Sequence, residues 1–148
     1  HYPLRRQRQM CIRDSISPTP QWQLQGNLAL TRARYENFVQ GGVSRAGNVP
    51  QLVPQQVANL WASYAITPTV TASAGVRHVG KVYGNAANTK FWPSYTLLDL
   101  GLAWKVNKTT TLTTRVRNAT DRIYAAETRD QVYLGAPRTL DVTLHTAF

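Results

Sequence analysis

The side chains that most often carry chemistry are few in this chain, and they lie far apart. His78 and His145 are too isolated to make a metal motif, so we interpret both as strand-surface residues. The single cysteine, Cys11, excludes an internal disulfide and a cysteine-based zinc site. The sequence has no Ser/His/Asp grouping and no glycine-rich phosphate loop. It therefore predicts no enzyme, and no metal or cofactor bound directly by the chain.

Charged side chains at alternate positions form the most suggestive pattern. They are Arg77, Asp99, Arg115, Arg117 and Asp141. Neighbouring arginines could attract an anion, but arginines that alternate near acids more often form a solvated ion-pair network. We therefore interpret these five residues as a polar network on one face of a sheet. Asn118 and Asp121 fit a turn that hydrogen-bonds its own backbone better than they fit acid catalysis.

The chain is strongly basic, with 17 basic and 7 acidic side chains in 148 residues and a net charge of +10. Residues 1–15 contribute four arginines, one acid and no strand or helix period. A signal peptide would need an apolar stretch after the basic residues, and none follows. A nucleic-acid-binding arm is one interpretation. The other is translated adapter sequence, which residues 10–15 resemble, so we expect a non-native leader outside the fold and a domain over residues 16–148.

Apolar side chains recur at even-numbered positions in six segments that proline, glycine and asparagine clusters separate. The segments are 22–31, 57–66, 70–77, 97–106, 111–117 and 139–148. A period of two is that of a β-strand with unlike faces. No window approaches the roughly 18 consecutive apolar residues of a membrane-spanning helix. A β-barrel that spans a membrane remains compatible with the sequence.

The connections between these segments alternate in length. Residues 67–69 and 107–109 form tight turns, whereas 36–55, 80–93 and 120–137 are long loops. Antiparallel strands with every tight turn at one end and every long loop at the other form an up-and-down sheet. Outer-membrane barrels are built in this way, with short periplasmic turns and longer extracellular loops.

Aromatic residues gather at both ends of the predicted strands. One rim has Trp22, Tyr64, Trp104 and Phe148, and the other has Tyr35, Tyr83, Trp92, Tyr95, Tyr124 and Tyr133. Such girdles lie at lipid headgroups. The strands of a soluble β-sandwich also alternate apolar and polar residues. A soluble all-β module could bind nucleic acid through aromatic side chains on a basic sheet. The polar odd-numbered face favours a barrel lumen. The predicted fold is therefore an all-β, antiparallel, up-and-down transmembrane barrel segment.

Five stretches resemble the β-barrel of TonB-dependent siderophore receptors, in the order expected of its C-terminal end. They are 48–64, 75–85, 93–99, 116–124 and 135–148. His78 and Asn85 depart from the family pattern, where we would expect an aromatic residue and an acid. The resemblance implies about six C-terminal strands of a roughly 22-stranded barrel. It also implies a bacterial outer-membrane location and uptake of a ferric siderophore.

The same resemblance implies partners and site residues. In this family an N-terminal plug fills the barrel, and the TonB complex pulls on a short segment before the plug. We expect plug, TonB-contacting segment and signal peptide to be absent here, so the fragment alone would have no activity. The loop residues expected to contact the ferric siderophore are Tyr83, Trp92, Arg129 and Tyr133.

The resemblance further implies that Phe148 is an address for the outer-membrane barrel assembly machinery. Membrane lipid is the expected neighbour of the apolar face. Nucleic acid is not an expected partner of a barrel.

Overall fold

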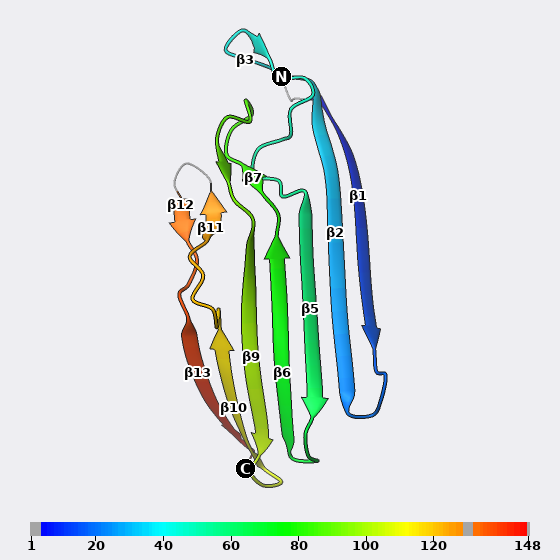
Figure 1. Ribbon diagram of the computed structural model, residues 1–148, viewed down its shortest axis with the longest axis vertical. Coiled ribbons are helices and arrows are strands. Elements are labelled where there is room, and N and C mark those ends of the chain that lie inside the picture. Colours follow the sequence, from blue (N-terminus) through cyan, green and yellow to red (C-terminus); the bar gives the residue numbers. More distant parts are fainter. Residues whose placement is uncertain (1–3, 129–131, 148) are drawn as a thin grey trace.

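The six alternating segments form six long strands of one antiparallel sheet, as the sequence predicts. The structure is a computed structural model that describes residues 4–128 and 132–147 (Figure 1). The sheet contains a seventh strand at its edge, and its spatial order is that of the chain: β1 (Leu4–Ile16), β2 (Trp22–Asn37), β5 (Gln56–Ala65), β6 (Val70–Val79), β9 (Tyr95–Lys105), β10 (Thr110–Arg117) and β13 (Thr139–Thr146). Over the described residues, no helix is long and apolar enough to cross a membrane.

Each long loop contains a small hairpin, and all three hairpins lie at the same end of the sheet (Figure 1). The hairpins are β3 (Val39–Gln40) with β4 (Val43–Ser44), β7 (Val82–Tyr83) with β8 (Phe91–Trp92), and β11 (Ala125–Thr128) with β12 (Val132–Leu134). The tight turns lie at the opposite end. The predicted up-and-down arrangement with two different ends is therefore confirmed.

Residues 4–16 form a strand, which corrects the expectation that residues 1–15 stand outside the fold. This strand, β1, pairs with β2 from Leu4 opposite Asn37 to Ile16 opposite Leu24. Backbone hydrogen bonds of an edge strand form whatever the side chains are, so weak alternation does not prevent pairing. The even-numbered Met10, Ile12 and Ile16 also continue the apolar face of the sheet. That the leader is non-native stays a prediction.

The strand register separates the two faces of the sheet by residue parity. Leu60 pairs with Val76, and Val76 pairs with Leu98, so even positions meet even positions across the sheet. The large apolar side chains exposed on the six predicted strands all have even numbers: Trp22, Leu28, Leu60, Tyr64, Val76, Leu100, Leu102, Trp104, Leu140, Val142 and Leu144. The charged residues of β5, β6, β9, β10 and β13 all have odd numbers: Arg77, Asp99, Lys105, Arg115, Arg117 and Asp141.

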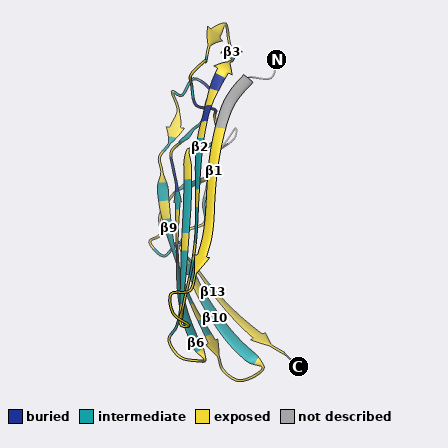
Figure 2. Ribbon diagram, turned by 90° about the vertical axis from the view of Figure 1, so that its right-hand side faces the viewer, coloured by how far each residue is buried: buried dark blue, intermediate teal, exposed yellow. Residues whose placement is uncertain are grey.

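The sheet is a single layer, and it has almost no core of its own (Figure 2). The buried apolar side chains lie mainly where the loops pack against the upper ends of the strands: Ala33, Tyr35, Val49, Val79 and Ala86. Elsewhere Leu60 is 55% exposed and Leu140 is 64% exposed. Burial of apolar surface is the main driving force of folding, so this face must be covered by something other than the chain itself.

The turn after β10 is held by Asn118, whose backbone has a φ of 49°. Its backbone N–H donates to Asp99 Oδ1 over 2.9 Å. Its side-chain amide donates to the carbonyls of Arg122 and Ala136, and its Oδ1 accepts from Arg122 N. Asp121, with a φ of 53°, accepts from Arg138 N. The predicted self-bonded turn is confirmed, and it ties the last loop to the sheet.

The parity of the two faces gives a direct test. Leu100 and Ser73 lie in adjacent rows, because Ala74 pairs with Leu100 and Ser73 pairs with Gly101. In the complete barrel, Leu100→Arg should lower the free energy of unfolding by about 2–4 kcal/mol, because it places a charge in hydrocarbon. Ser73→Arg, at the same depth on the odd face, should cost less. Denaturant titration in lipid vesicles measures both, and equal costs would contradict the assignment of the faces.

Candidate functional site

A hollow of about 450 Å³ lies at the loop end of the odd-numbered face. Its floor is a row of residues from three neighbouring strands, because Val57 pairs with Val79 and Val79 pairs with Tyr95. Arg77, two residues before Val79 on the same face, also lines it. We call this cavity the upper hollow. It combines apolar side chains with two aromatic rings, those of Trp92 and Tyr95, and with the guanidinium of Arg77.

The walls of the upper hollow come from the long loops. They are Leu52, Pro54, Gly80, Val82, Trp92, Pro93, Ala125 and Ala126. The walls are joined by backbone hydrogen bonds, since Leu52 N donates to Tyr83 O over 2.8 Å and Gly80 N donates to Gln56 O over 2.8 Å. Asn88 adds a second link, because its side chain accepts from Val49 N and donates to Val49 O. The loops are thus held together over the floor.

Trp92 is fixed by the hairpin that carries it. In the β7–β8 register Val82 pairs with Trp92, and Tyr83 pairs with Phe91. Val82 and Trp92 therefore share one face, and both line the upper hollow. The indole ring lies across Gly84, where any added Cβ would overlap its six-membered ring. Glycine at this position is what allows the close approach of the ring to the backbone.

Tyr83 and Tyr133, two of the other loop candidates, do not join Trp92 in the upper hollow. Tyr83 lies on the opposite face of the hairpin, where Lys81 Nζ is 4.7 Å from its ring centroid and 5.4 Å from that of Phe91. Tyr133 is 56% exposed on β12 and does not line the upper hollow. Arg129 lies outside the described residues. The ligand roles of all four residues stay predictions.

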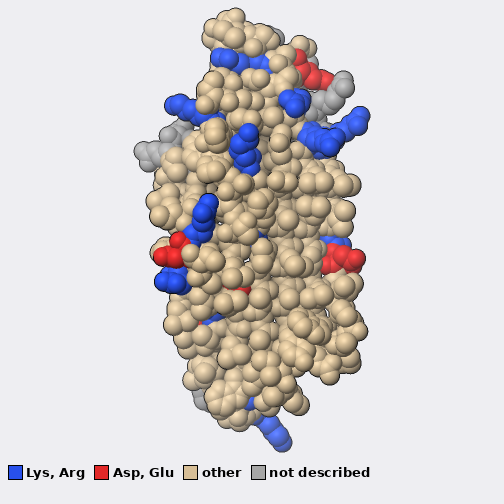
Figure 3. All heavy atoms as spheres, in the orientation of Figure 1, with Lys and Arg blue, Asp and Glu red and all other residues tan. Residues whose placement is uncertain are grey.

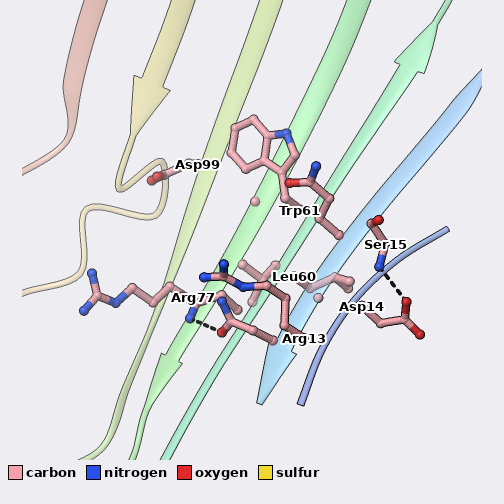
Figure 4. Close-up of a pocket in the computed structure, with 13 residues that line it drawn as sticks. Arg13, Asp14, Ser15, Leu60, Trp61, Arg77 and Asp99 are labelled. Carbon is pink, nitrogen blue, oxygen red and sulfur yellow. Dashed lines mark hydrogen bonds between the residues drawn. The ribbon is translucent and has the colours of Figure 1, made fainter. Parts of the chain in front are cut away.

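A second, larger hollow of about 770 Å³ lies below the first on the same face. Figure 4 shows Arg13, Trp61, Arg77 and Asp99 around it, with β1 contributing Arg13, Asp14 and Ser15. Polar groups of its wall bond one another, since Asn59 Nδ2 donates to Asn27 Oδ1 over 2.7 Å. We call it the lower hollow. Arg77 lines both hollows and therefore lies where the two adjoin.

The five charged residues of the predicted network have separate contacts. Arg117 pairs with Asp141, with its Nε 2.8 Å from Oδ2 and its Nη2 3.1 Å from Oδ1. Arg115 instead lies over the Trp61 ring, 6.0 Å from its centroid. Asp99 accepts the hydrogen bond from Asn118, and Arg77 lines the two hollows. Only one ion pair therefore joins members of this set.

Sequence reasoning missed most of the lining of the upper hollow. Val57, Val79 and Tyr95 continue the odd-numbered face at the upper strand ends, so extending the parity rule would have found them. Leu52, Pro54 and Ala125 lie in loops, where no period applies. Within the described residues, no three His, Cys, Asp or Glu side chains cluster as metal ligands would.

Basic side chains gather toward the loop end of the molecule. In the face shown in Figure 3, most Lys and Arg atoms lie in the half that carries the hairpins, and the half with the tight turns is nearly uncharged. The basic residues of this end include Arg32, Arg34, Arg45, Lys81, Lys90, Arg122 and Arg138. A positive potential at this end attracts anions.

The fold and the two-faced sheet agree with a known family. Residues 8–119, more than half of the chain, match the family described as TonB dependent receptor-like, beta-barrel. The chain belongs to this family. It is thus a segment of a bacterial outer-membrane β-barrel. The match begins at residue 8, inside the segment that the sequence alone suggested to be a leader.

Relatives of this chain include a probable siderophore receptor and a ferrioxamine receptor. A probable TonB-dependent siderophore receptor, PiuA of Acinetobacter baumannii, is 41% identical over 78 residues, or 53% of this chain and 10% of that protein. The ferrioxamine receptor of Yersinia enterocolitica is 33% identical over 122 residues, or 76% of this chain and 17% of that protein. The chain thus spans between a tenth and a fifth of the length of these relatives.

Solved structures show the same arrangement of strands. The crystal structure of PiuA from Acinetobacter baumannii superposes with a TM-score of 0.85 at 24% identity, over 96% of this chain and 22% of that one. BauA, the ferric preacinetobactin receptor of the same species, superposes with a TM-score of 0.79 at 30% identity, over 95% of this chain and 22% of that one. The predicted barrel fold is confirmed.

The contact between Trp92 and Gly84 yields a test of the upper hollow. In the complete receptor, Gly84→Ala should displace the indole, because a methyl group cannot share its place. Trp92 should then be oxidised faster by N-bromosuccinimide, as measured by mass spectrometry of the digested protein. Gly26→Ala is a matched control, since its added Cβ would have no neighbour nearer than 3.9 Å. An unchanged oxidation rate in Gly84→Ala would contradict the described packing.

Proposed function

We propose that this chain is the C-terminal part of the barrel of a receptor that carries ferric siderophores across the outer membrane in a TonB-dependent manner. The observation that carries the proposal is the two-faced sheet, with exposed apolar side chains at even positions and charges at odd positions. Family membership and the names of the relatives support it. A soluble all-β module would instead expose the apolar face to water, at a cost of about 25 cal/mol per Å².

The upper hollow is the part of this chain best suited to contact the siderophore. It lies at the loop end, which is the extracellular end in outer-membrane barrels. Its lining combines the guanidinium of Arg77 with the rings of Trp92 and Tyr95. Few precisely placed polar groups among apolar walls are typical of small-molecule sites. The role of this chain is binding and passage of the ligand, with no catalysis and no resident cofactor.

The remaining partners follow from the same proposal. Lipid covers the even-numbered face. At the turn end of that face the rings of Trp22 and Tyr64 lie with their centroids 4.7 Å apart. The TonB complex acts on parts of the receptor that precede this segment. The barrel assembly machinery reads the last strand, β13, which lies at the edge of the sheet.

Iron uptake tests the proposed function. The complete receptor, expressed in a bacterial strain that lacks its own siderophore receptors, should restore uptake of radioactive iron supplied as a ferric siderophore. Deletion of TonB in the same strain should abolish that uptake, because transport by this family depends on TonB. A receptor that reaches the outer membrane and transports no catecholate, hydroxamate or carboxylate ferric siderophore would contradict the proposal.

Phe148, which lies outside the described residues, gives a test of assembly. Phe148→Ala removes at most about 1.5–3 kcal/mol of burial, too little to unfold a large barrel. An address for the assembly machinery predicts a several-fold loss of receptor in the outer membrane, while the molecules that arrive keep normal heat resistance. Leu144→Ala, on the apolar face of the same strand, is the control and should leave the amount unchanged. Normal abundance with lowered heat resistance would make Phe148 an ordinary rim residue.

A further inference from the structure

We propose that two of the long loops, residues 38–55 and 80–94, open and close as one cooperative unit because Asn88 and Asn48 link them. We call these segments the first loop and the second loop. The inference concerns the conformation of the loop end of the barrel and goes beyond the proposed uptake function. It does not depend on which ligand the receptor carries.

The central contact is two-pronged, between the side chain of Asn88 and the backbone of Val49. Val49 N donates to Asn88 Oδ1 over 2.8 Å, and Asn88 Nδ2 donates to Val49 O over 2.8 Å. Adjacent antiparallel strands exchange N–H and C=O bonds in the same way. The contact joins positions 39 residues apart in the chain. Asn88 therefore binds the first loop as a neighbouring strand would.

Further hydrogen bonds between the loops run from the first to the second. Asn48 Nδ2 donates to Ala86 O over 2.9 Å, and Leu52 N donates to Tyr83 O over 2.8 Å. At Asn88 the second loop supplies the side chain, and at Asn48 the first loop does. Each loop thus satisfies polar groups of the other, and groups left unsatisfied in a part-buried site are costly.

A small apolar core lies beside these bonds. Val49, Pro50 and Ala86 are each at most 6% exposed, in a sheet that has almost no core elsewhere. Val49 and Ala86 belong to different loops, and both take part in the hydrogen bonds that join them. Separation of the loops would expose these side chains to water, and burial of apolar surface opposes that exposure.

Backbone strain at Leu52 couples the loops further. Its φ is 63°, and that of Asn88 is 57°. Asparagine adopts this left-handed conformation readily, whereas a bulky residue such as leucine rarely does. A strained residue keeps its conformation only where the surrounding structure holds it. The second loop holds Leu52 through Tyr83 O. Displacement of the second loop therefore lets the first loop relax as well.

The upper hollow receives its walls from both loops. Leu52 and Pro54 belong to the first loop, and Val82 and Trp92 belong to the second. Because the loops are linked, the hollow opens when both move together. Coupling between two sites is reciprocal. A ligand that holds Trp92 in place therefore also stabilises the first loop.

Hydrogen–deuterium exchange of the complete receptor tests this inference. Mass spectrometry with fragmentation reads the amides of Leu52 and Gly84, which donate to Tyr83 O and Lys90 O and do not touch the side chain of Asn88. Asn88→Gly removes the linking amide and keeps the left-handed backbone, which glycine adopts freely. Both amides should exchange at least about tenfold faster, because the linked loops lose the same buried hydrogen bonds.

Asn48→Ala is a second variant and removes the link from the side of the first loop. It too should accelerate exchange at both Leu52 and Gly84. Asn107→Gly is the matched control, because the Asn107 side chain holds the tight turn at the opposite end of the sheet. It should leave both exchange rates unchanged.

Three results would overturn the inference. Acceleration confined to Leu52 or to Gly84 in both linking variants would show that the loops open separately. Unchanged exchange in both variants would show that the asparagines do not hold the loops together. Equal acceleration in Asn107→Gly would indicate a general loss of barrel stability.

Discussion

The structure depends on one constraint, which is that every backbone hydrogen-bonding group within a membrane must find a partner in the protein. Lipid offers neither donors nor acceptors, so strands that cross it must pair along their whole length. The six predicted strands do so with their sequence neighbours, and β1 extends the ladder at one edge. Because the pairing is uninterrupted, even-numbered residues of one strand lie opposite even-numbered residues of the next. The apolar face, the polar face and the position of both hollows follow from that parity.

The sequence alone predicts the six strands, because apolar and polar side chains alternate visibly within each of them. Leu98, Leu100, Leu102 and Trp104 mark one strand without reference to any other. It was insufficient for residues 4–16, where Leu4, Met10, Ile12 and Ile16 follow the even pattern but arginines and an acid interrupt it. Edge pairing uses backbone groups common to all residues, so composition cannot report it.

The site was less predictable than the fold because it is assembled from loops. Trp92 and Tyr83 looked equivalent in sequence, but the hairpin register places them on opposite faces. The acid Asp99, expected in a polar network with the arginines, also accepts a hydrogen bond from the backbone of Asn118, which no pattern within its strand predicts. Both outcomes depend on contacts between distant segments, such as those of Asn88 with Val49. No local period contains that information, whereas Arg77 was found because it lies in a strand.

Among the residues that the structure describes, three aromatic rings lie across a glycine: Trp61 across Gly75, Trp92 across Gly84 and Tyr124 across Gly135. Each ring therefore occupies its place only while its neighbour lacks a side chain. All three rings border a hollow or stack on a residue that lines one, so ligand preference can drift in evolution through Gly84 and Gly135, which line neither hollow. Comparisons of relatives that score only the lining residues would miss such changes. The informative unit for comparing receptors of this kind is the ring together with its glycine.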